Sequence, residues 1–227
     1  MTGWPRFRRA RVKPHWRHLV ALLDRHGVET VLDIGANVGQ YARSLRRAGW
    51  SGRIVSFEPQ SQVHAQLSAA AADDPGWHVA PPMALGARAG EETINLSNES
   101  DMSSLLAMRA DFLATSPTSR RVGRETIRVE TLDAVFDDHV GAGARAFVKI
   151  DTQGYEAAVL DGAAAVLPRV IGLQLELSLV PLYEGEVTYR VLMERLAAAG
   201  FALHLVIPGY FSRHRVRMLQ FDGIFFR

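Results

Sequence analysis

Short apolar runs alternate with stretches of helical periodicity along the first third of the chain and again along the last third. The apolar runs predict strands, and stretches whose apolar positions recur every three or four residues predict helices. The predicted strands are residues 29–34, 53–57, 77–80, 146–150, 170–177, 201–207 and 219–226. The predicted helices are residues 15–26, 63–72, 155–166 and 187–199, with another that follows a turn at 35–39 and runs to about 48. Such alternation favours a doubly wound, mostly parallel α/β sheet with right-handed crossovers.

The middle of the chain departs from this alternation. Residues 92–98 and 125–130 both have the pattern of strands, and a long polar segment separates them. Within that segment, residues 102–113 are predicted to form a helix and residues 116–121 an exposed loop. We therefore expect a basic arm and helix at 1–27, followed by a single domain at 28–227 with an inserted hairpin or lid.

Composition excludes several classes of protein and site. With 48% hydrophobic and 22% charged residues, the chain is not globally disordered. It has no cysteine, which excludes disulfides, thiolate nucleophiles, iron–sulfur ligation and cysteine-type zinc sites. No run approaches the roughly 18–20 apolar residues of a membrane-spanning helix, and Leu19 to Leu23 is too short for a signal-peptide core. The sequence predicts a soluble, cytoplasmic protein without a transmembrane segment.

Charge is placed unevenly along the chain. The first 23 residues carry six basic side chains and no acid, so a net charge of +2 leaves −4 for the remainder. A basic arm of this kind suits nucleic acid or an anionic surface. It contains no recognisable nucleic-acid-binding motif, so we favour a solvated terminus and expect no nucleic-acid partner.

The turn after the first strand of the sheet suggests a nucleotide-type cofactor. Ligands of open parallel sheets bind beyond the carboxyl ends of the strands, near the point where strand order reverses. A dinucleotide site requires three glycines around its pyrophosphate, but Asn37 occupies the middle place between Gly35 and Gly39. Asp33 would repel a pyrophosphate, whereas it suits the cationic ammonium and sulfonium groups of S-adenosylmethionine. We expect these four residues to bind that cofactor.

A second acid supports an adenosine-containing ligand. Glu58 follows the next predicted strand, 23 residues after Gly35. A carboxylate at this strand end accepts hydrogen bonds from both hydroxyls of a ribose, in NAD and S-adenosylmethionine sites alike. Glu58 therefore indicates adenosine, while Asp33 and Asn37 indicate which adenosine cofactor it is.

Several motifs, in order along the chain, resemble the FkbM-type methyltransferases. They are Asp-Ile-Gly-Ala-Asn-Val-Gly at 33–39, Phe57-Glu58-Pro59, Ala84-Leu85-Gly86, Val-Lys-Ile-Asp-Thr-Gln-Gly-Tyr-Glu at 148–156, Leu-Glu-Leu-Ser at 175–178 and Pro-Leu-Tyr at 181–183. The resemblance covers roughly residues 28–227; the pair Thr152-Gln153 departs from the Val-Glu or Val-Gln common in the family. It implies a class I, Rossmann-like fold and S-adenosylmethionine-dependent transfer of methyl to oxygen, typically a sugar or natural-product hydroxyl.

Two carboxylates are the candidate catalytic residues. Asp151 ends a central strand on the same face as Lys149, and Glu176 lies on the polar side of the next strand. They suit a general base beside the acceptor, or a pair of ligands for one magnesium or manganese ion, since hard cations take oxygen ligands. They equally suit direct binding of acceptor hydroxyls. For Asp151, the structural alternative is an ion pair with Lys149 or a cap for the helix after Gly154.

The resemblance adds three further cofactor residues. Ala84 lies in one of the shared motifs, and the inserted segment is expected to fold over the methionine end of the cofactor. There Ser103 or Ser104 would donate a hydrogen bond to the methionine carboxylate. A serine cap of a helix N-terminus explains the same residues equally well.

Together these features predict an S-adenosylmethionine-dependent O-methyltransferase whose acceptor is a small molecule or an oligosaccharide. The expected substrate is a saccharide hydroxyl of a polysaccharide, a glycolipid or a glycosylated natural product. The alternatives are an RNA or protein methyltransferase that uses the basic arm, and a non-catalytic module that binds an adenosine cofactor. The sequence leaves an oligomeric assembly open.

Overall fold

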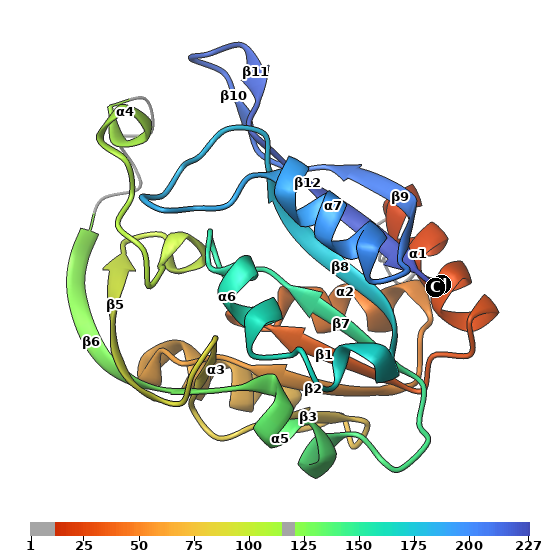
Figure 1. Ribbon diagram of the computed structural model, residues 1–227. Coiled ribbons are helices and arrows are strands. Elements are labelled where there is room, and N and C mark those ends of the chain that lie inside the picture. Colours follow the sequence, from red (N-terminus) through yellow and green to blue (C-terminus); the bar gives the residue numbers. More distant parts are fainter. Residues whose placement is uncertain (1–11, 115–120) are drawn as a thin grey trace, which may run out of the picture.

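The computed structural model describes residues 12–114 and 121–227. Most of the basic arm and almost all of the predicted loop at 116–121 lie outside these ranges. Within them, helices cover both faces of a central sheet, and a smaller group of strands lies along one side of it (Figure 1). No helix in the described ranges has the length and apolar character needed to cross a bilayer.

The central sheet of the described chain contains seven strands in the order β3-β2-β1-β7-β8-β12-β9. Their bounds are β1 (Thr30–Ile34), β2 (Arg53–Phe57), β3 (Trp77–Val79), β7 (Ala146–Ile150), β8 (Val170–Ser178), β9 (Ala202–Pro208) and β12 (Gln220–Phe226). The strands from β3 to β8 pair in parallel, and β12 is antiparallel to both of its neighbours. The predicted doubly wound, mostly parallel sheet is confirmed. Its order reverses between β1 and β7.

The helices divide between the two faces of the sheet because neighbouring strand residues point to opposite sides. In β1, Val31 packs with α1 (Pro14–Arg25), α2 (Gln40–Ala48) and α3 (Ser61–Ala71). Leu32 packs on the opposite face with α5 (Leu132–His139), α6 (Glu156–Asp161) and α7 (Tyr189–Ala198). Every residue of β1 is buried, as expected for a strand covered by helices on both faces.

The inserted segment forms the predicted hairpin. Strands β5 (Gly90–Ser97) and β6 (Arg121–Glu130) pair antiparallel, and β4 (Ala84–Leu85) adds to β6 in parallel. In Figure 1, β5 and β6 form a long curved pair beside the main sheet. A second, short hairpin, β10 (Phe211–Ser212) and β11 (Arg217–Met218), projects beyond the end of the sheet.

The predicted helix at 102–113 is wrong. The segment contains the end of a 3-10 turn (Ser100–Met102), an extended stretch and only four residues of helix, α4 (Ala110–Leu113). Its backbone N–H and C=O groups form hydrogen bonds with distant parts of the chain instead of with residues four positions away, as a helix would require. Ser104 forms an antiparallel bridge with Asn95, and Met108 forms one with Tyr183. These tertiary hydrogen bonds outweigh the local preference for helix.

The predicted helix at 155–166 is shorter in the structure. Helix α6 ends at Asp161, and a turn leads to a second 3-10 segment, Leu167–Arg169. At the end of α6, a Cβ on Gly162 would lie 2.0 Å from the carbonyl oxygen of Gly86. The close approach of these two backbones places the turn against the β4 region.

Candidate active site

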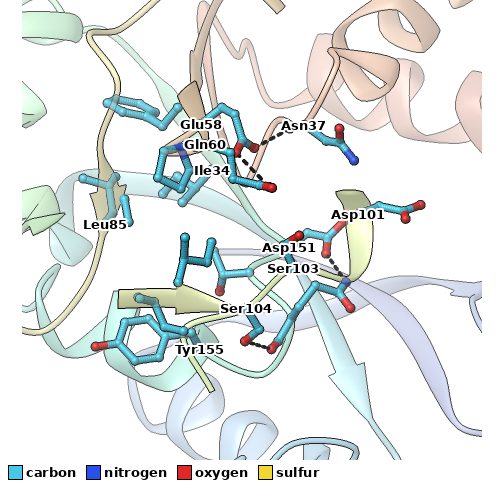
Figure 2. A pocket seen from close by; sticks show the side chains of 18 of the residues that line it. Ile34, Asn37, Glu58, Gln60, Leu85, Asp101, Ser103, Ser104, Asp151 and Tyr155 are labelled. Atoms are coloured by element: carbon cyan, nitrogen blue, oxygen red, sulfur yellow. Dashed lines mark hydrogen bonds between the residues drawn. The ribbon is translucent and has the colours of Figure 1, made fainter. Parts of the chain in front are cut away.

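A pocket opens at the carboxyl ends of β1, β2 and β7 (Figure 2), where strand order reverses. Its empty volume, including the open mouth, is about 630 Å³. In Figure 2, Glu58 and Asn37 lie on one wall, Ser104 and Tyr155 lie on the opposite wall, and Asp151 lies between them. We call this cavity the strand-end pocket. Of the sequence-predicted site residues, it is lined by Gly35, Asn37, Glu58, Ala84, Ser103, Ser104 and Asp151.

The turn after β1 is shaped by backbone contacts. Gly35 has φ 73°, and a Cβ there would lie 1.9 Å from the carbonyl oxygen of Asp151, so no other residue fits. Gly39 also has a positive φ of 83°, but it does not line the pocket. A Cβ on Gly39 would lie 2.5 Å from the ring of Trp77. Gly39 thus allows close packing against Trp77, and its predicted contact with the cofactor stays a prediction.

Glu58 is almost fully buried in the wall of the pocket, with 3% of its surface exposed. Its carboxylate accepts hydrogen bonds from the backbone N–H of Asn37 at 2.9 Å and of Gln60 at 3.0 Å, and from Gln60 Nε2 at 3.2 Å. Burial raises the pKa of Glu58, and these hydrogen bonds oppose the rise. Three of about four acceptor positions are used, which leaves Oε2 able to accept from a ligand hydroxyl.

Asp33, which the sequence predicts to contact the cofactor, does not line the pocket. It is fully buried beneath the turn, and its Oδ1 lies 3.1 Å from Lys149 Nζ in an ion pair. Ser56 donates to its other oxygen at 3.4 Å. The three residues stand side by side on β2, β1 and β7, so the charge of Asp33 is compensated within the sheet.

Lys149, which forms the ion pair with Asp33, also contacts residues that line the pocket. Its ammonium donates to the carbonyl oxygen of Gly35 at 2.8 Å and lies 3.6 Å from Asp151 Oδ2. Although burial alone would lower it, the pKa of Lys149 is raised by the carboxylates of Asp33 and Asp151. Lys149 is therefore a buried cation that hydrogen-bonds to the turn after β1 and lies next to the carboxylate of Asp151. The ion pair named as the structural alternative for Asp151 is present.

Asp151 and Glu176 are brought together by an amide that the sequence analysis did not select. Gln153 Nε2 donates to Asp151 Oδ1 at 2.8 Å and to Glu176 Oε2 at 2.8 Å. The hydroxyl of Tyr183 donates to Gln153 Oε1 at 2.9 Å, which determines the orientation of the amide. Gln153 has φ 56°, a conformation that is uncommon for a residue other than glycine and is found at strained functional sites. The signal available in the sequence was its place in the shared motif before Gly154.

The two carboxylates differ in their access to ligands. The side chain of Asp151 is 34% exposed and lines the pocket. Glu176 does not line the pocket, and its Oε2 also accepts from Gln220 Nε2 at 2.7 Å. Burial and the nearby charges of Asp151 and Asp222 raise the pKa of Glu176 well above its usual value. Asp151 is the carboxylate accessible from the pocket, and Glu176 is linked to it through Gln153.

The predicted metal site does not fit this arrangement. A divalent cation needs free carboxylate oxygens, but the amide nitrogen of Gln153 lies between Asp151 and Glu176, where the ion would bind. Within residues 12–114 and 121–227, no group of three or more histidine, aspartate or glutamate side chains is arranged to hold a metal ion. We derive no step through a metal.

Glu156, not Asp151, caps the loop that follows β7. Its Oε1 accepts from the backbone N–H of Thr152 at 2.9 Å and of Gly154 at 3.2 Å. Burial raises the pKa of Glu156 to about 7, and the hydrogen bonds within the loop oppose the rise. This cap holds the turn that presents Asp151 and Gln153 to the pocket.

The serines of the inserted segment close one side of the pocket. Ser104 donates to the carbonyl oxygen of Gln153 at 2.7 Å, so its proton is already engaged. Ser103 accepts from the backbone N–H of Ser97 at 3.0 Å and retains its own proton for a ligand. Ser100 donates to the side-chain oxygen of Asn37 at 3.0 Å and thereby links the segment to the turn after β1. Of the two predicted donors, Ser104 donates to a carbonyl oxygen, whereas the Ser103 hydroxyl donates to no acceptor among residues 12–114 and 121–227.

Comparison with known proteins identifies what this fold and pocket resemble. A model of the methyltransferase FkbM domain matches residues 33–203. No curated protein sequence shows significant similarity to the chain. A candidate methyltransferase from Thermobifida fusca YX has a similar structure, with a TM-score of 0.52 at 14% identity over 93% of this chain and 78% of that chain.

Two further solved structures match at lower TM-scores. An rRNA methylase from Streptococcus thermophilus has a TM-score of 0.49 at 12% identity, over 96% of this chain and 99% of that chain. Aeropyrum pernix fibrillarin, solved with natively bound S-adenosyl-L-methionine, has a TM-score of 0.47 at 11% identity, over 92% of this chain and 74% of that chain. The family match and the Thermobifida fusca structure together show the class I methyltransferase fold.

Proposed function

The chain belongs to the FkbM methyltransferase family and is an S-adenosylmethionine-dependent methyltransferase, and we propose that it transfers the methyl group to a saccharide hydroxyl. The acceptor would be a sugar of a polysaccharide, a glycolipid or a glycosylated natural product. The observation that carries this proposal is the partly exposed Asp151 carboxylate, held by Gln153 and Lys149 at the end of the strand-end pocket.

The lining of the pocket fits the cofactor. Glu58 Oε2 would accept a hydrogen bond from a ribose hydroxyl, and the lining residues Met83, Ala84 and Leu85 suit the adenine ring. Ser103 would donate to the methionine carboxylate. The cofactor supplies a methyl group bound to a positively charged sulfur, which is open to attack by an oxygen nucleophile.

The residues of the chain must supply a proton acceptor for the alkyl hydroxyl. A hydroxyl is a poor nucleophile while it keeps its proton, so a group near the acceptor has to take that proton. Asp151 Oδ1 is held by Gln153 Nε2, and its Oδ2 faces Lys149 at 3.6 Å. Two such partners orient the carboxylate and leave acceptor positions that face the pocket. In the proposed reaction, Asp151 takes the hydroxyl proton as the oxygen–methyl bond forms. The methyl–sulfur bond of the bound cofactor would break at the same time, with S-adenosylhomocysteine as the leaving group.

The proposal is tested by measuring the transfer of labelled methyl from S-adenosylmethionine to a panel of sugars and glycans. Asp151→Asn keeps the shape of the side chain but removes its charge, and it should lower turnover by ~100-fold or more. The affinity for S-adenosylmethionine, measured by calorimetry, should change little. Asp138→Asn, at an exposed position on α5, serves as the control and should be as active as wild type.

Treatment with a chelator separates proton transfer from metal catalysis in the same assay. Because Gln153 lies between the two carboxylates, activity should survive chelation. Loss of activity that magnesium or manganese restores would contradict this assignment. An Asp151→Asn variant with nearly wild-type turnover would make Asp151 a structural residue.

The other two functions predict different results in these experiments. An RNA methyltransferase would bind RNA in a salt-sensitive manner, and replacing Arg6, Arg8, Arg9 and Arg11 with glutamine would abolish the binding. A non-catalytic module would bind the cofactor and methylate no hydroxyl acceptor.

A further inference from the structure

A second, wider cavity adjoins the strand-end pocket. It is lined by residues of α1, α2, β7, β8, β9 and β12, and its empty volume is about 1400 Å³, which includes open solvent. We call it the α1 groove, and the residues that matter here are Trp16, Tyr41, Arg47, Asp151, Gln174 and Asp222. The FkbM match begins at residue 33 and therefore does not cover α1.

The two cavities meet at Asp151. This residue and Gln40 are lining residues of both the strand-end pocket and the α1 groove. A methyltransferase needs its two substrates on opposite sides of the transferred group, with the proton acceptor at the same point. The α1 groove reaches Asp151 and is not lined by Glu58, so it is a separate space in which an acceptor can meet the same carboxylate.

The floor of the groove is polar and hydrogen-bonded. Tyr41 donates from its hydroxyl to Gln174 Oε1 at 3.0 Å, and Asp222 lines the groove beside them. Burial and the charge of Asp151 raise the pKa of Asp222 to about 6. The carboxylate can accept hydrogen bonds from ring hydroxyls, and the neighbouring amide N–H group can donate to them.

The walls of the groove combine an aromatic ring with free cations. Trp16 is partly exposed and packs at 5.3 Å, ring centroid to ring centroid, against the edge of Tyr41. An indole that is partly accessible from the groove can pack against the apolar face of a sugar ring. Lys13 and Arg47 are exposed at the rim, and neither forms an ion pair with another described residue. A rim of this charge favours an anionic group on the ligand.

We propose that the α1 groove is the acceptor site and that it takes an anionic saccharide. The sugar ring packs on Trp16, one hydroxyl reaches Asp151, and a phosphate or carboxylate substituent lies near Lys13 and Arg47. This inference rests on the proposed saccharide O-methylation and adds the location of the acceptor and its charge.

The full-length protein, saturated with S-adenosylhomocysteine, is titrated with glucose, glucose 6-phosphate and glucuronic acid, and binding is followed by tryptophan fluorescence. The two anionic sugars should bind more tightly than glucose, and comparing them separates phosphate from carboxylate recognition. The chain has four tryptophans, so Trp16→Phe should remove the fluorescence response if the sugar contacts Trp16.

Arg47→Gln should raise KM for the anionic sugars by about tenfold, because a charge-assisted hydrogen bond is lost, and should leave KM for glucose unchanged. The control is Arg25→Gln, an exposed position about 13 Å farther along α1 from Trp16. It should behave as wild type, and none of the three variants should change the affinity for S-adenosylmethionine.

Three outcomes would overturn the proposal in distinguishable ways. In the first, the protein methylates sugars, but Trp16→Phe keeps the fluorescence response and Arg47→Gln keeps the wild-type KM. The acceptor would then bind elsewhere, and saccharide methylation itself would stand. Equal affinity for glucose and the anionic sugars would refute the charge preference. If the wild-type protein binds no sugar and methylates none, this inference and the proposed function are both refuted.

Discussion

Glu58 is the residue on which cofactor affinity should depend most directly. Replacing it with alanine removes a buried carboxylate that faces the ribose position, and it should weaken S-adenosylmethionine binding by about 1–3 kcal/mol. Titration calorimetry on the folded variant measures this loss. Glu194→Ala, an exposed position on α7, is the matched control. Unchanged affinity in Glu58→Ala would show that Glu58 does not contact the ribose, and tight NAD binding by wild type would contradict the cofactor assignment.

Glu156 should make stability depend on pH. Its pKa is raised by burial from 4.5 to about 7, so the folded protein holds this proton more tightly than the unfolded chain does. The free energy of unfolding therefore falls as pH rises through the interval from 4.5 to 7. Glu156→Gln keeps an oxygen for the loop N–H groups but removes the buried charge.

We expect Glu156→Gln to raise the free energy of unfolding by about 1–3 kcal/mol at pH 8 and to change it little at pH 4. Urea denaturation of wild type and variant at the two pH values provides the comparison. A variant less stable than wild type at pH 8 would mean that the hydrogen bonds of the ionised carboxylate outweigh the cost of its burial.

At the scale of elements, the stretch 99–105 should behave as a lid. Its hydrogen bonds to the pocket wall include those from Ser100 to Asn37 at 3.0 Å, from Gln60 to the carbonyl oxygen of Ser100 at 3.4 Å, and from Ser104 to the carbonyl oxygen of Gln153 at 2.7 Å. A ligand that bridges both sides would add contacts and slow local opening. S-adenosylmethionine should slow amide hydrogen exchange in this stretch by roughly tenfold or more.

The β10–β11 hairpin provides an internal control in the same experiment, because it lines neither cavity and its exchange should not respond. Hydrogen exchange is a better probe than trypsin, since Arg121 and Arg124 lie in the paired strand β6. Equal exchange rates with and without cofactor would make the stretch an ordinary surface segment.

At the scale of the whole molecule, α1 should unfold together with the rest of the domain. Leu19 and Leu23 are completely buried and join the core that includes Val31 of β1 and Phe226 of β12. Leu23→Ala should therefore lower the free energy of unfolding by about 2–5 kcal/mol. Circular dichroism and tryptophan fluorescence should report the same single transition in urea.

Leu113→Ala, at a position that is 37% exposed, controls for loss of a leucine and should change stability by less than about 0.5 kcal/mol. Two separate transitions, or a Leu23→Ala variant as stable as wild type, would show that α1 folds independently of the sheet. One wall of the proposed acceptor site would then belong to a helix that unfolds separately from the rest of the domain.

The sequence by itself determined the order of the elements and the placement of Glu58, Gly35 and Asp151 at the carboxyl ends of strands. Local patterns carry this information, because alternation of apolar runs and helical periodicity depends only on residues near one another in the chain. The turn glycines could be read for the same reason. Parallel pairing then brings the strand ends to one edge of the sheet, so the candidate site follows from the order of elements.

Only the tertiary structure decided which polar groups meet. Asp33 faces Lys149 because β1 and β7 are neighbours, and 116 residues of chain separate the two side chains. Gln153 bridges two carboxylates because Tyr183 orients its amide from another part of the chain. The helix predicted at 102–113 gave way to bridges with Asn95 and Tyr183. Contacts between residues far apart in the chain leave no local pattern, and burial gives them enough energy to override local preference.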